Sequence, residues 1–148
     1  MQVFAVSGLP EICPGDDLAA LVEERVDVRE GDVLTIASTV VSKAEGRTAD
    51  LADFEPGERA RRIAQRIGEL TDETKDPRFA QAVIEESEEL LLEAPFILAA
   101  TRFGHITVNA GIDRSNVPGA ELLLLPTDPT ESARRLRETL GVPVIVTD

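Results

Sequence analysis

Three short apolar runs lie close together near the middle of the chain, and they constrain its fold more than any other feature. They cover residues 89–94, 96–103 and 105–111, and Pro95 and Gly104 separate them. Apolar runs of this length with turn residues between them are typical of consecutive strands in an antiparallel sheet. The sequence therefore predicts a mostly antiparallel sheet in this part of the chain.

Helical patterns flank these runs on both sides. Apolar residues recur at helical spacing after Asp16 or Asp17, which can cap the first free amides of a helix. The same spacing follows Pro56, where Ile63, Ile67 and Leu70 form an apolar face. Two more helices are predicted, one from Asp76 and Pro77 to about Glu86, and one from a capping box at Asp128, Pro129 and Glu131 to Gly141.

Further strands are predicted at residues 2–6, 32–38, 121–126 and 142–148, and a polar segment ending at Gly46 follows the second of them. The mixed order of strands and helices predicts an α+β fold, with a mixed, largely antiparallel sheet on which the helices pack. The sequence contains no GxGxxG and no P-loop pattern. At 148 residues, the chain is expected to form a single domain over 1–148.

Composition excludes several classes of protein. The one cysteine, Cys13, and the one histidine, His105, leave a disulfide framework, a zinc site or a catalytic histidine dyad without partners. No apolar stretch approaches the roughly 20 residues of a membrane helix, and the amino terminus has no signal-peptide pattern. We therefore expect a soluble, cytoplasmic protein with no membrane partner.

Charge is the most distinctive bulk property. The chain carries 28 acidic residues against 15 Lys and Arg, a formal net charge of −13, and it has no Trp or Tyr. A surface this negative repels phosphate backbones, and there are few aromatic residues on which bases can stack, so nucleic-acid binding is disfavoured. An acidic surface with two lysines is what we expect of a protein from a salty cytoplasm, where salt screens self-repulsion.

Two segments in the first third of the chain are candidate binding sites. In GLPEI, residues 8–12, Gly and Pro allow close approach of backbone amides to a base or phosphate, although such residues also occur in ordinary strand-to-helix connections. In STVVSKAEGR, residues 38–47, Lys43 can place a compact charge on a phosphate while Ser38 and Thr39 donate hydrogen bonds. The alternative is a solvated Lys43 paired with Glu45.

The third candidate segment is NAGIDRSNVPG, residues 109–119. Asp113 can ligate a hard cation such as Mg²⁺ or Mn²⁺ and Asn116 can contact a nucleotide, and Asp148 supplies a second carboxylate at the end of a predicted strand. The alternative is an Asx-type turn that satisfies its own backbone. Arg114 can bind an anionic substrate or pair with a neighbouring acid.

Other polar residues have a structural interpretation. Cys13 is expected to be an inert small residue, because no histidine lies nearby to activate it. His105 is expected to be a strand residue. Arg134, Arg135 and Arg137 lie toward the carboxyl end of a predicted helix, where the helix dipole favours cations.

These motifs resemble a known family. GLPEI, GDDLA, STVVSKAEGR, DPRF, NAGIDRSNVPG, LLLPTDP and VIVTD occur in the order and spacing of coenzyme F420-0:γ-glutamyl ligases, and the similarity covers the whole chain. The family's members add L-glutamate to the deazaflavin coenzyme F420-0 using GTP. They are similar to this sequence only in their first part and continue for about another domain's length.

The resemblance implies a role for each candidate residue. GTP would contact Ser38, Thr39, Lys43, Asn116 and the segment of Leu9, Pro10, Glu11 and Ile12, while Asp113 and Asp148 would hold Mg²⁺ or Mn²⁺. It also implies an acyl-phosphate mechanism, a monovalent cation such as K⁺, and an intertwined homodimer. No catalytic residue is assigned.

Two other interpretations remain open. In the first, the chain is a non-catalytic GTP-binding or assembly module that needs a separate second half. In the second, it is a structural fragment without affinity for ligands. Guanine specificity rests on the resemblance alone, and the residues that recognise the deazaflavin are not identified.

Overall fold

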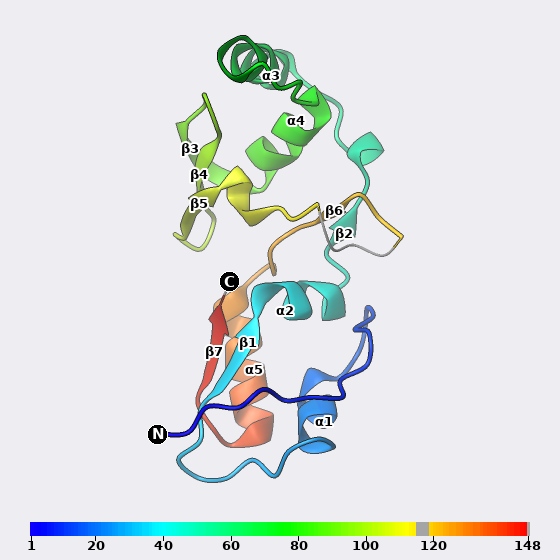
Figure 1. Cartoon of the computed structure of the whole chain (residues 1–148), viewed down its shortest axis with the longest axis vertical. Coiled ribbons are helices and arrows are strands. Elements are labelled where there is room, and N and C mark those ends of the chain that lie inside the picture. The colour runs from blue at the N-terminus through cyan, green and yellow to red at the C-terminus, as the bar shows by residue number, and fades with distance from the viewer. Residues whose placement is uncertain (115–118, 148) are drawn as a thin grey trace. The chain divides into compact units, whose positions relative to one another are not determined.

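The computed structural model describes residues 1–114 and 119–147 and divides the chain into two compact units. Unit 1 combines Met1–Arg47 with Pro126–Asp148, and unit 2 is Thr48–Leu125. Unit 2 is therefore inserted into unit 1 along the chain (Figure 1). This division does not test the expectation of one domain over 1–148, which stays a prediction.

Unit 1 is built on a parallel strand pair. β1 (Leu34–Ala37) pairs with β7 (Val144–Thr147), and Leu34 lies opposite Val144. Parallel neighbours need a long crossover, and here the connection includes α2, all of unit 2 and α5. Helix α5 (Pro129–Leu140) packs against β7, and α1 (Leu18–Glu23) packs against α5 (Figure 1). The buried core is Leu18, Ala19, Ile36, Val41 and Leu136.

Helix ends in unit 1 follow the predicted capping residues. The Asp17 carboxylate accepts hydrogen bonds from the amides of Ala19 and Ala20, both at 3.1 Å. The Asp128 carboxylate accepts from the Glu131 amide at 2.9 Å, and Gly141 ends α5 in the left-handed conformation. The carboxylate of Glu131 bonds to arginines of its own helix, so only the Asp128 half of the predicted capping box is observed.

Unit 2 contains the predicted antiparallel sheet. β3 (Ser87–Leu92), β4 (Leu98–Thr101) and β5 (Ile106–Val108) lie in sequence order, as the three apolar runs predicted. Helices α3 (Glu58–Thr71) and α4 (Pro77–Glu85) pack against each other, and α4 also contacts β3 (Figure 1). The Asp76 carboxylate caps α4 by accepting from the Arg78 amide at 2.8 Å.

Short elements complete unit 2. β2 (Thr48–Ala49) pairs antiparallel with β6 (Leu122–Leu123), and two 3₁₀ turns, η1 (Leu51–Asp53) and η2 (Asn109–Gly111), flank the core. The core gathers fifteen buried residues among those described. They are Leu51, Phe54, Ala60, Ile63, Ile67, Phe79, Ala80, Ala82, Val83, Ile97, Ala99, Ala110, Ile112, Leu122 and Leu124.

The predicted α+β class is confirmed. Two of the three described sheets are antiparallel, and the parallel pair of unit 1 makes the arrangement mixed. Within the residues described, no helix has both the length and the apolar character needed to cross a bilayer. The intertwined arrangement with a second chain stays a prediction.

Two predicted elements are wrong. Residues 2–6 form no strand, because no other strand pairs with them and their apolar side chains remain exposed, 86% at Val3 and 68% at Phe4. Residues 38–44 form helix α2 (Ser38–Ala44), although Ser38 was predicted to end a strand and no helix was predicted in the polar segment after it. The buried residues of α2 are Ser38, Val41 and Ser42, which share one helical face, so two hydroxyls in that face hid its amphipathic pattern.

Leu70 was also placed wrongly. It lies on α3 but is 59% exposed, whereas Ile63 and Ile67 are buried as predicted. The helix then ends at Asp72, which adopts a left-handed conformation with φ of 57°. Leu70 thus lies in the last turn of α3, on an exposed side of the helix.

Candidate functional site

The segment Leu9–Ile12 lies outside regular structure in unit 1, where contacts at both ends hold it. Arg25 Nε donates to the carbonyl of Gly8 at 2.9 Å, and Ile12 packs against the core. Just beyond, the amide of Gly15 donates to the carbonyl of Ala44 at 2.8 Å. The segment is thereby tied to the carboxyl end of α2.

An ion pair joins two of the predicted nucleotide-binding segments. The Lys43 ammonium lies 2.8 Å from Glu11 Oε1, and the Lys43 side chain is 13% exposed while that of Glu11 is 63% exposed. The predicted alternative, a pair between Lys43 and Glu45, is wrong, because the Glu45 carboxylate instead accepts from the Thr127 amide and the Ser132 hydroxyl. A largely desolvated cation with one exposed acidic partner is thus the central feature of this region.

Ser38 and Thr39 are the first two residues of α2, directly after β1. Ser38 is 8% exposed and Thr39 is partly buried. Lys43 lies on the same helix, so α2 carries three of the residues predicted to bind the nucleotide, and the ion pair adds Glu11. The structure therefore brings the predicted residues of the first third of the chain into one region of unit 1.

Asp113 belongs to unit 2, where strand pairing fixes its backbone. Its amide donates to the Leu123 carbonyl and its carbonyl accepts from the Leu123 amide, both at 2.9 Å. The chain reaches Asp113 through three successive left-handed residues, Asn109, Ala110 and Gly111. A Cβ at Gly111 would lie 2.6 Å from Leu125 Cδ1, so this position requires glycine.

The rest of the predicted metal site is not tested. Asn116 and Asp148 lie outside the described residues, so neither the pairing of Asp148 with Asp113 nor the Asx-type turn over Asp113 and Asn116 can be checked. Within residues 1–114 and 119–147, no three His, Cys, Asp or Glu side chains gather as metal ligands. A carboxylate such as that of Asp113 has the donor chemistry that Mg²⁺ and Mn²⁺ prefer. The ligand set over Asp113 and Asp148 remains a prediction.

Sequence reasoning singled out Arg114 in unit 2 but missed Lys75, which lies against the same aromatic ring. Lys75 Nζ lies 4.8 Å and Arg114 Cζ 5.3 Å from the centre of the Phe79 ring. Burial, and then the charge of Arg114, lower the pKa of Lys75 below its ordinary value of 10.5. The available signal was that Lys75 is the other of the two lysines and stands directly before the DPRF motif.

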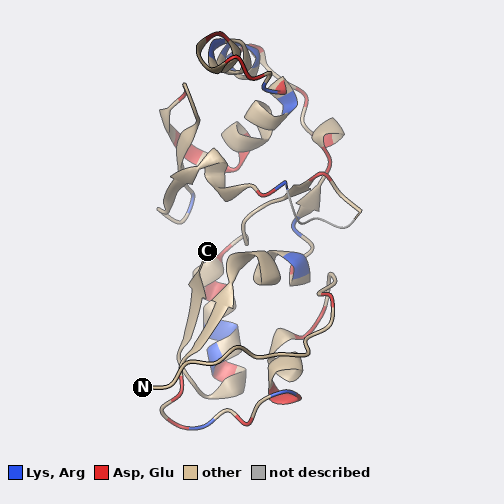
Figure 2. Cartoon of the chain, in the orientation of Figure 1, with Lys and Arg blue, Asp and Glu red and all other residues tan. Residues whose placement is uncertain are grey.

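The arginines of α5 keep their structural interpretation. Helix α5 carries acidic and basic residues along its length (Figure 2), and hydrogen bonds from Arg134 and Arg135 lower the pKa of Glu131 to about 2. Because these arginines pair within their own helix, side-chain pairing adds to the helix-dipole argument. Cys13 is a free, exposed thiol. The prediction of a strand residue at His105 is wrong, because His105 lies just before β5 and outside it.

Comparison with known proteins decides the family. Residues 8–148 match the family described as F420-0:Gamma-glutamyl ligase. The chain belongs to this family. The similarity inferred from GLPEI, STVVSKAEGR and NAGIDRSNVPG is thereby confirmed.

Individual relatives are similar over the whole chain. A coenzyme F420:L-glutamate ligase of Natronomonas pharaonis is 70% identical over 148 residues, which are all of this chain and 58% of that protein. The protein of the same name from Halorubrum lacusprofundi is 66% identical and that from Archaeoglobus fulgidus 52%, each matched over all of this chain and 59% of its own length. The chain thus spans less than two thirds of the length of these curated relatives.

Proposed function

We propose that this chain is the amino-terminal part of a GTP-dependent ligase that adds L-glutamate to coenzyme F420-0. The observation that carries the proposal is family membership over residues 8–148, together with relatives named coenzyme F420:L-glutamate ligase. L-glutamate and coenzyme F420-0 are the proposed substrates, and a homodimer in the cytoplasm is the proposed working form. The GTP site is proposed for unit 1, at Leu9–Ile12, Ser38, Thr39 and Lys43.

The Glu11–Lys43 ion pair supports this nucleotide site. Lys43 is largely desolvated, and a desolvated cation is stabilised by an anion held at hydrogen-bonding distance. In the structure that anion is the exposed Glu11 carboxylate, which can move into water at low cost. A phosphate of GTP would then take its place on Lys43, while Glu11 itself becomes solvated.

The proposed chemistry has two steps. A terminal carboxylate oxygen of coenzyme F420-0 attacks the γ-phosphorus of GTP, the bond to the β-phosphate oxygen breaks, and GDP leaves. The amine of L-glutamate then attacks the acyl carbon, phosphate leaves with the bonding electron pair, and the nitrogen loses a proton to form the amide. Lys43 neutralises charge on the phosphates, and the backbone of Leu9–Ile12 orients the nucleotide.

A divalent cation belongs to this proposal through Asp113. Its carboxylate, with that of Asp148, would hold Mg²⁺ or Mn²⁺, and such an ion supplies charge neutralisation at the phosphates when bound. A monovalent cation such as K⁺ is a further proposed cofactor, and no described residue is assigned to it. The role of this chain's own residues is to hold the nucleotide and to place its phosphates.

Calorimetric titration of the chain with GTP, with and without Mn²⁺, tests the nucleotide site. We expect Mn²⁺-dependent binding that Lys43→Ala weakens by about tenfold or more, because one charge-assisted contact to phosphate is lost. Arg29→Ala is the matched control, since Arg29 is also a cation of unit 1 in an ion pair, but its side chain is 76% exposed. A folded Lys43→Ala chain that binds GTP like the parent would remove Lys43 from the site.

The same titration tests the metal ligand. Asp113→Asn keeps the size of the side chain and removes its charge, so we expect GTP binding to lose its dependence on Mn²⁺. If the variant titrates like the parent at every Mn²⁺ concentration, Asp113 does not hold the cation. Absence of GTP binding by the folded parent chain would favour the structural fragment or a module that is completed by a second half.

A further inference from the structure

Two cations of unit 2 converge on one aromatic ring without a carboxylate between them. Lys75 and Arg114 both lie within cation–π distance of Phe79, at 4.8 and 5.3 Å. In the part of the chain that the structure describes, neither forms an ion pair with an acidic side chain. Other cations of the described residues, such as Arg61 and Arg66, also lack an ion pair, so the shared aromatic ring is what distinguishes Lys75 and Arg114.

Two carboxylates act electrostatically on this pair without forming an ion pair with it, Asp76 on Arg114 and Glu73 on Lys75. Asp76 is engaged by Arg78 at 2.7 Å and also caps α4, and Glu73 is an exposed residue whose charge acts on Lys75 less than burial and Arg114 do. The net effect on Lys75 is a lowered pKa, so its charged form is disfavoured where it stands. An anion bound between Lys75 and Arg114 would turn this mutual repulsion into attraction.

Phe79 and Lys75 are held in place by contacts within unit 2. Phe79 is 2% exposed and lies in the first turns of α4, so its ring is fixed by the core. Lys75 Nζ donates to Asn109 Oδ1 at 3.5 Å, and Asn109 adopts a left-handed conformation with φ of 53° in η2. Asparagine tolerates this conformation better than most residues, at some energetic cost. The strained turn thus places an amide oxygen at the Lys75 ammonium.

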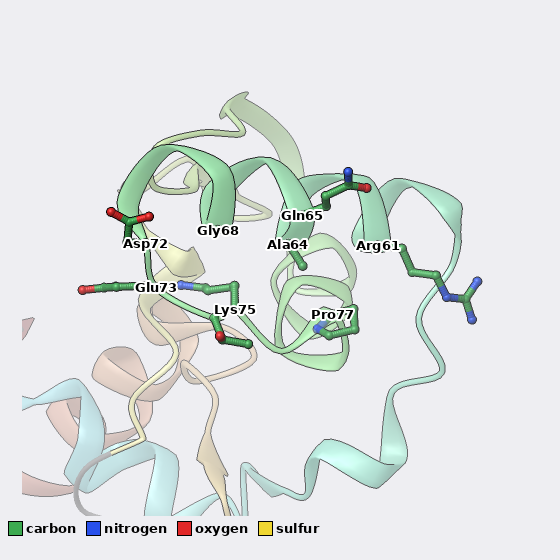
Figure 3. Close-up of a pocket in the computed structure, with 9 residues that line it drawn as sticks. Arg61, Ala64, Gln65, Gly68, Asp72, Glu73, Lys75 and Pro77 are labelled. Atoms are coloured by element: carbon green, nitrogen blue, oxygen red, sulfur yellow. The ribbon is translucent and has the colours of Figure 1, made fainter.

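Space for a ligand lies beside Lys75. A hollow of about 500 Å³ borders Lys75 and runs along α3, and Figure 3 shows Arg61 at the opposite end with its guanidinium directed away from Lys75. Asp72 and Glu73 also line the hollow and are exposed. Figure 3 shows these two acids at the same end of the hollow as Lys75, so the attraction of Lys75 and Arg114 for an anion must outweigh repulsion by the acids.

We propose that Lys75 and Arg114, positioned by Phe79 and Asn109, form a binding site for the carboxylate or phosphate group of a small acidic ligand. The site belongs to unit 2 and uses none of the residues of the Glu11–Lys43 region, so it goes beyond the proposed nucleotide site. The guanidinium offers paired donors to two oxygens of the anion, and the ammonium adds a point charge. Asn109 keeps the ammonium in place while the anion is absent.

Binding of two probes to the 148-residue chain tests this site. Glutarate carries carboxylates and pyrophosphate carries phosphates, and each is titrated at constant ionic strength while the side-chain Nε–H signal of Arg114 and the Nζ signal of Lys75 are followed by NMR. We expect saturable binding of one probe, which identifies the chemical group. Lys75→Gln and Arg114→Gln should each weaken that binding by about tenfold, because each removes one charge-assisted contact.

Matched variants distinguish a specific binding site from nonspecific attraction of the anionic probe to surface cations. Arg66→Gln removes one exposed cation from α3 of the same unit and should change the affinity less than twofold, while Lys75→Arg should retain most of it. Equal weakening by Arg66→Gln, or no saturable binding of either probe to the folded chain, would overturn the proposal. The NMR signals of Lys75 and Arg114 report on this site alone, so failure of GTP binding and failure of probe binding here give different results.

Discussion

The two units of this chain are ordered by different amounts of buried surface. Unit 2 packs fifteen described residues into one apolar cluster under a three-stranded sheet and two helices. The corresponding apolar cluster of unit 1 contains five described residues. Since burial of apolar surface is the main favourable term in folding, unit 2 should be the more stable part.

The proposed GTP site gives this difference a testable consequence. The segment Leu9–Ile12 and the first residues of the chain lie outside regular structure, in the unit with the smaller core. Regions that bind ligands are often drawn from the less stable parts of a protein, because they must open and close. A ligand that binds the folded form stabilises it by mass action, so GTP should protect unit 1 more than unit 2.

The largest expected effect comes from truncating the core of unit 2. Ile97, directly before β4, is fully buried, and Ile97→Ala should cost about 3 to 5 kcal/mol through lost burial and the cavity left behind. Ile36→Ala, in β1 of unit 1, should cost about 2 kcal/mol, because its cluster is smaller and relaxes more easily. Urea unfolding and amide hydrogen exchange in each unit measure the loss of stability in both variants. A larger loss for Ile36→Ala would invert the comparison.

The next largest effect is at the turn before Asp113. Gly111→Ala places a Cβ 2.6 Å from Leu125 Cδ1 at a φ of +69°, and we expect a loss of about 2 to 3 kcal/mol. Gly104→Ala is the control, since φ there is +83° but no atom lies within 4 Å. It should cost about 1 kcal/mol, from backbone strain alone. Equal losses in urea unfolding would mean that the contact with Leu125 relaxes freely.

A smaller effect is expected at the caps. Asp17→Ala leaves two amides of α1 without their carboxylate partner and should destabilise unit 1 by about 1 kcal/mol. Asp17→Asn keeps an acceptor and should recover most of the loss. Hydrogen exchange at Ala19 and Ala20 is the readout, and exchange that stays as slow in Asp17→Ala as in the parent would contradict the role of the cap.

The smallest effect is the acid dependence of α5. Hydrogen bonds from Arg134 and Arg135 lower the pKa of Glu131 to about 2 from an ordinary 4.5, so the contribution of Glu131 to stability is complete above pH 4.5 and is lost as the pH falls toward 2. The group is exposed, so added salt should weaken the effect. The thermal midpoint of Glu131→Gln should fall less steeply between pH 5 and 2.5 than that of the parent, and parallel curves would exclude this role.

Local patterns in the sequence were sufficient for many elements. Asp17, Asp76 and Asp128 mark helix starts because their carboxylates accept from free amides in the next turn, whatever the rest of the fold does. The three apolar runs predicted β3, β4 and β5 because short turns make neighbours in sequence neighbours in a sheet. The motifs likewise indicated the family before any geometry was known.

Other features were decided only by tertiary structure, because they depend on which distant segments meet. Residues 2–6 alternate like a strand but lack a partner, and α2 buries two hydroxyls that look polar in sequence. Lys43 pairs with Glu11, 32 residues away, and not with nearby Glu45. Lys75 is close to Phe79 in sequence, whereas Arg114 is distant from both. Only folding brings these two cations to the Phe79 ring.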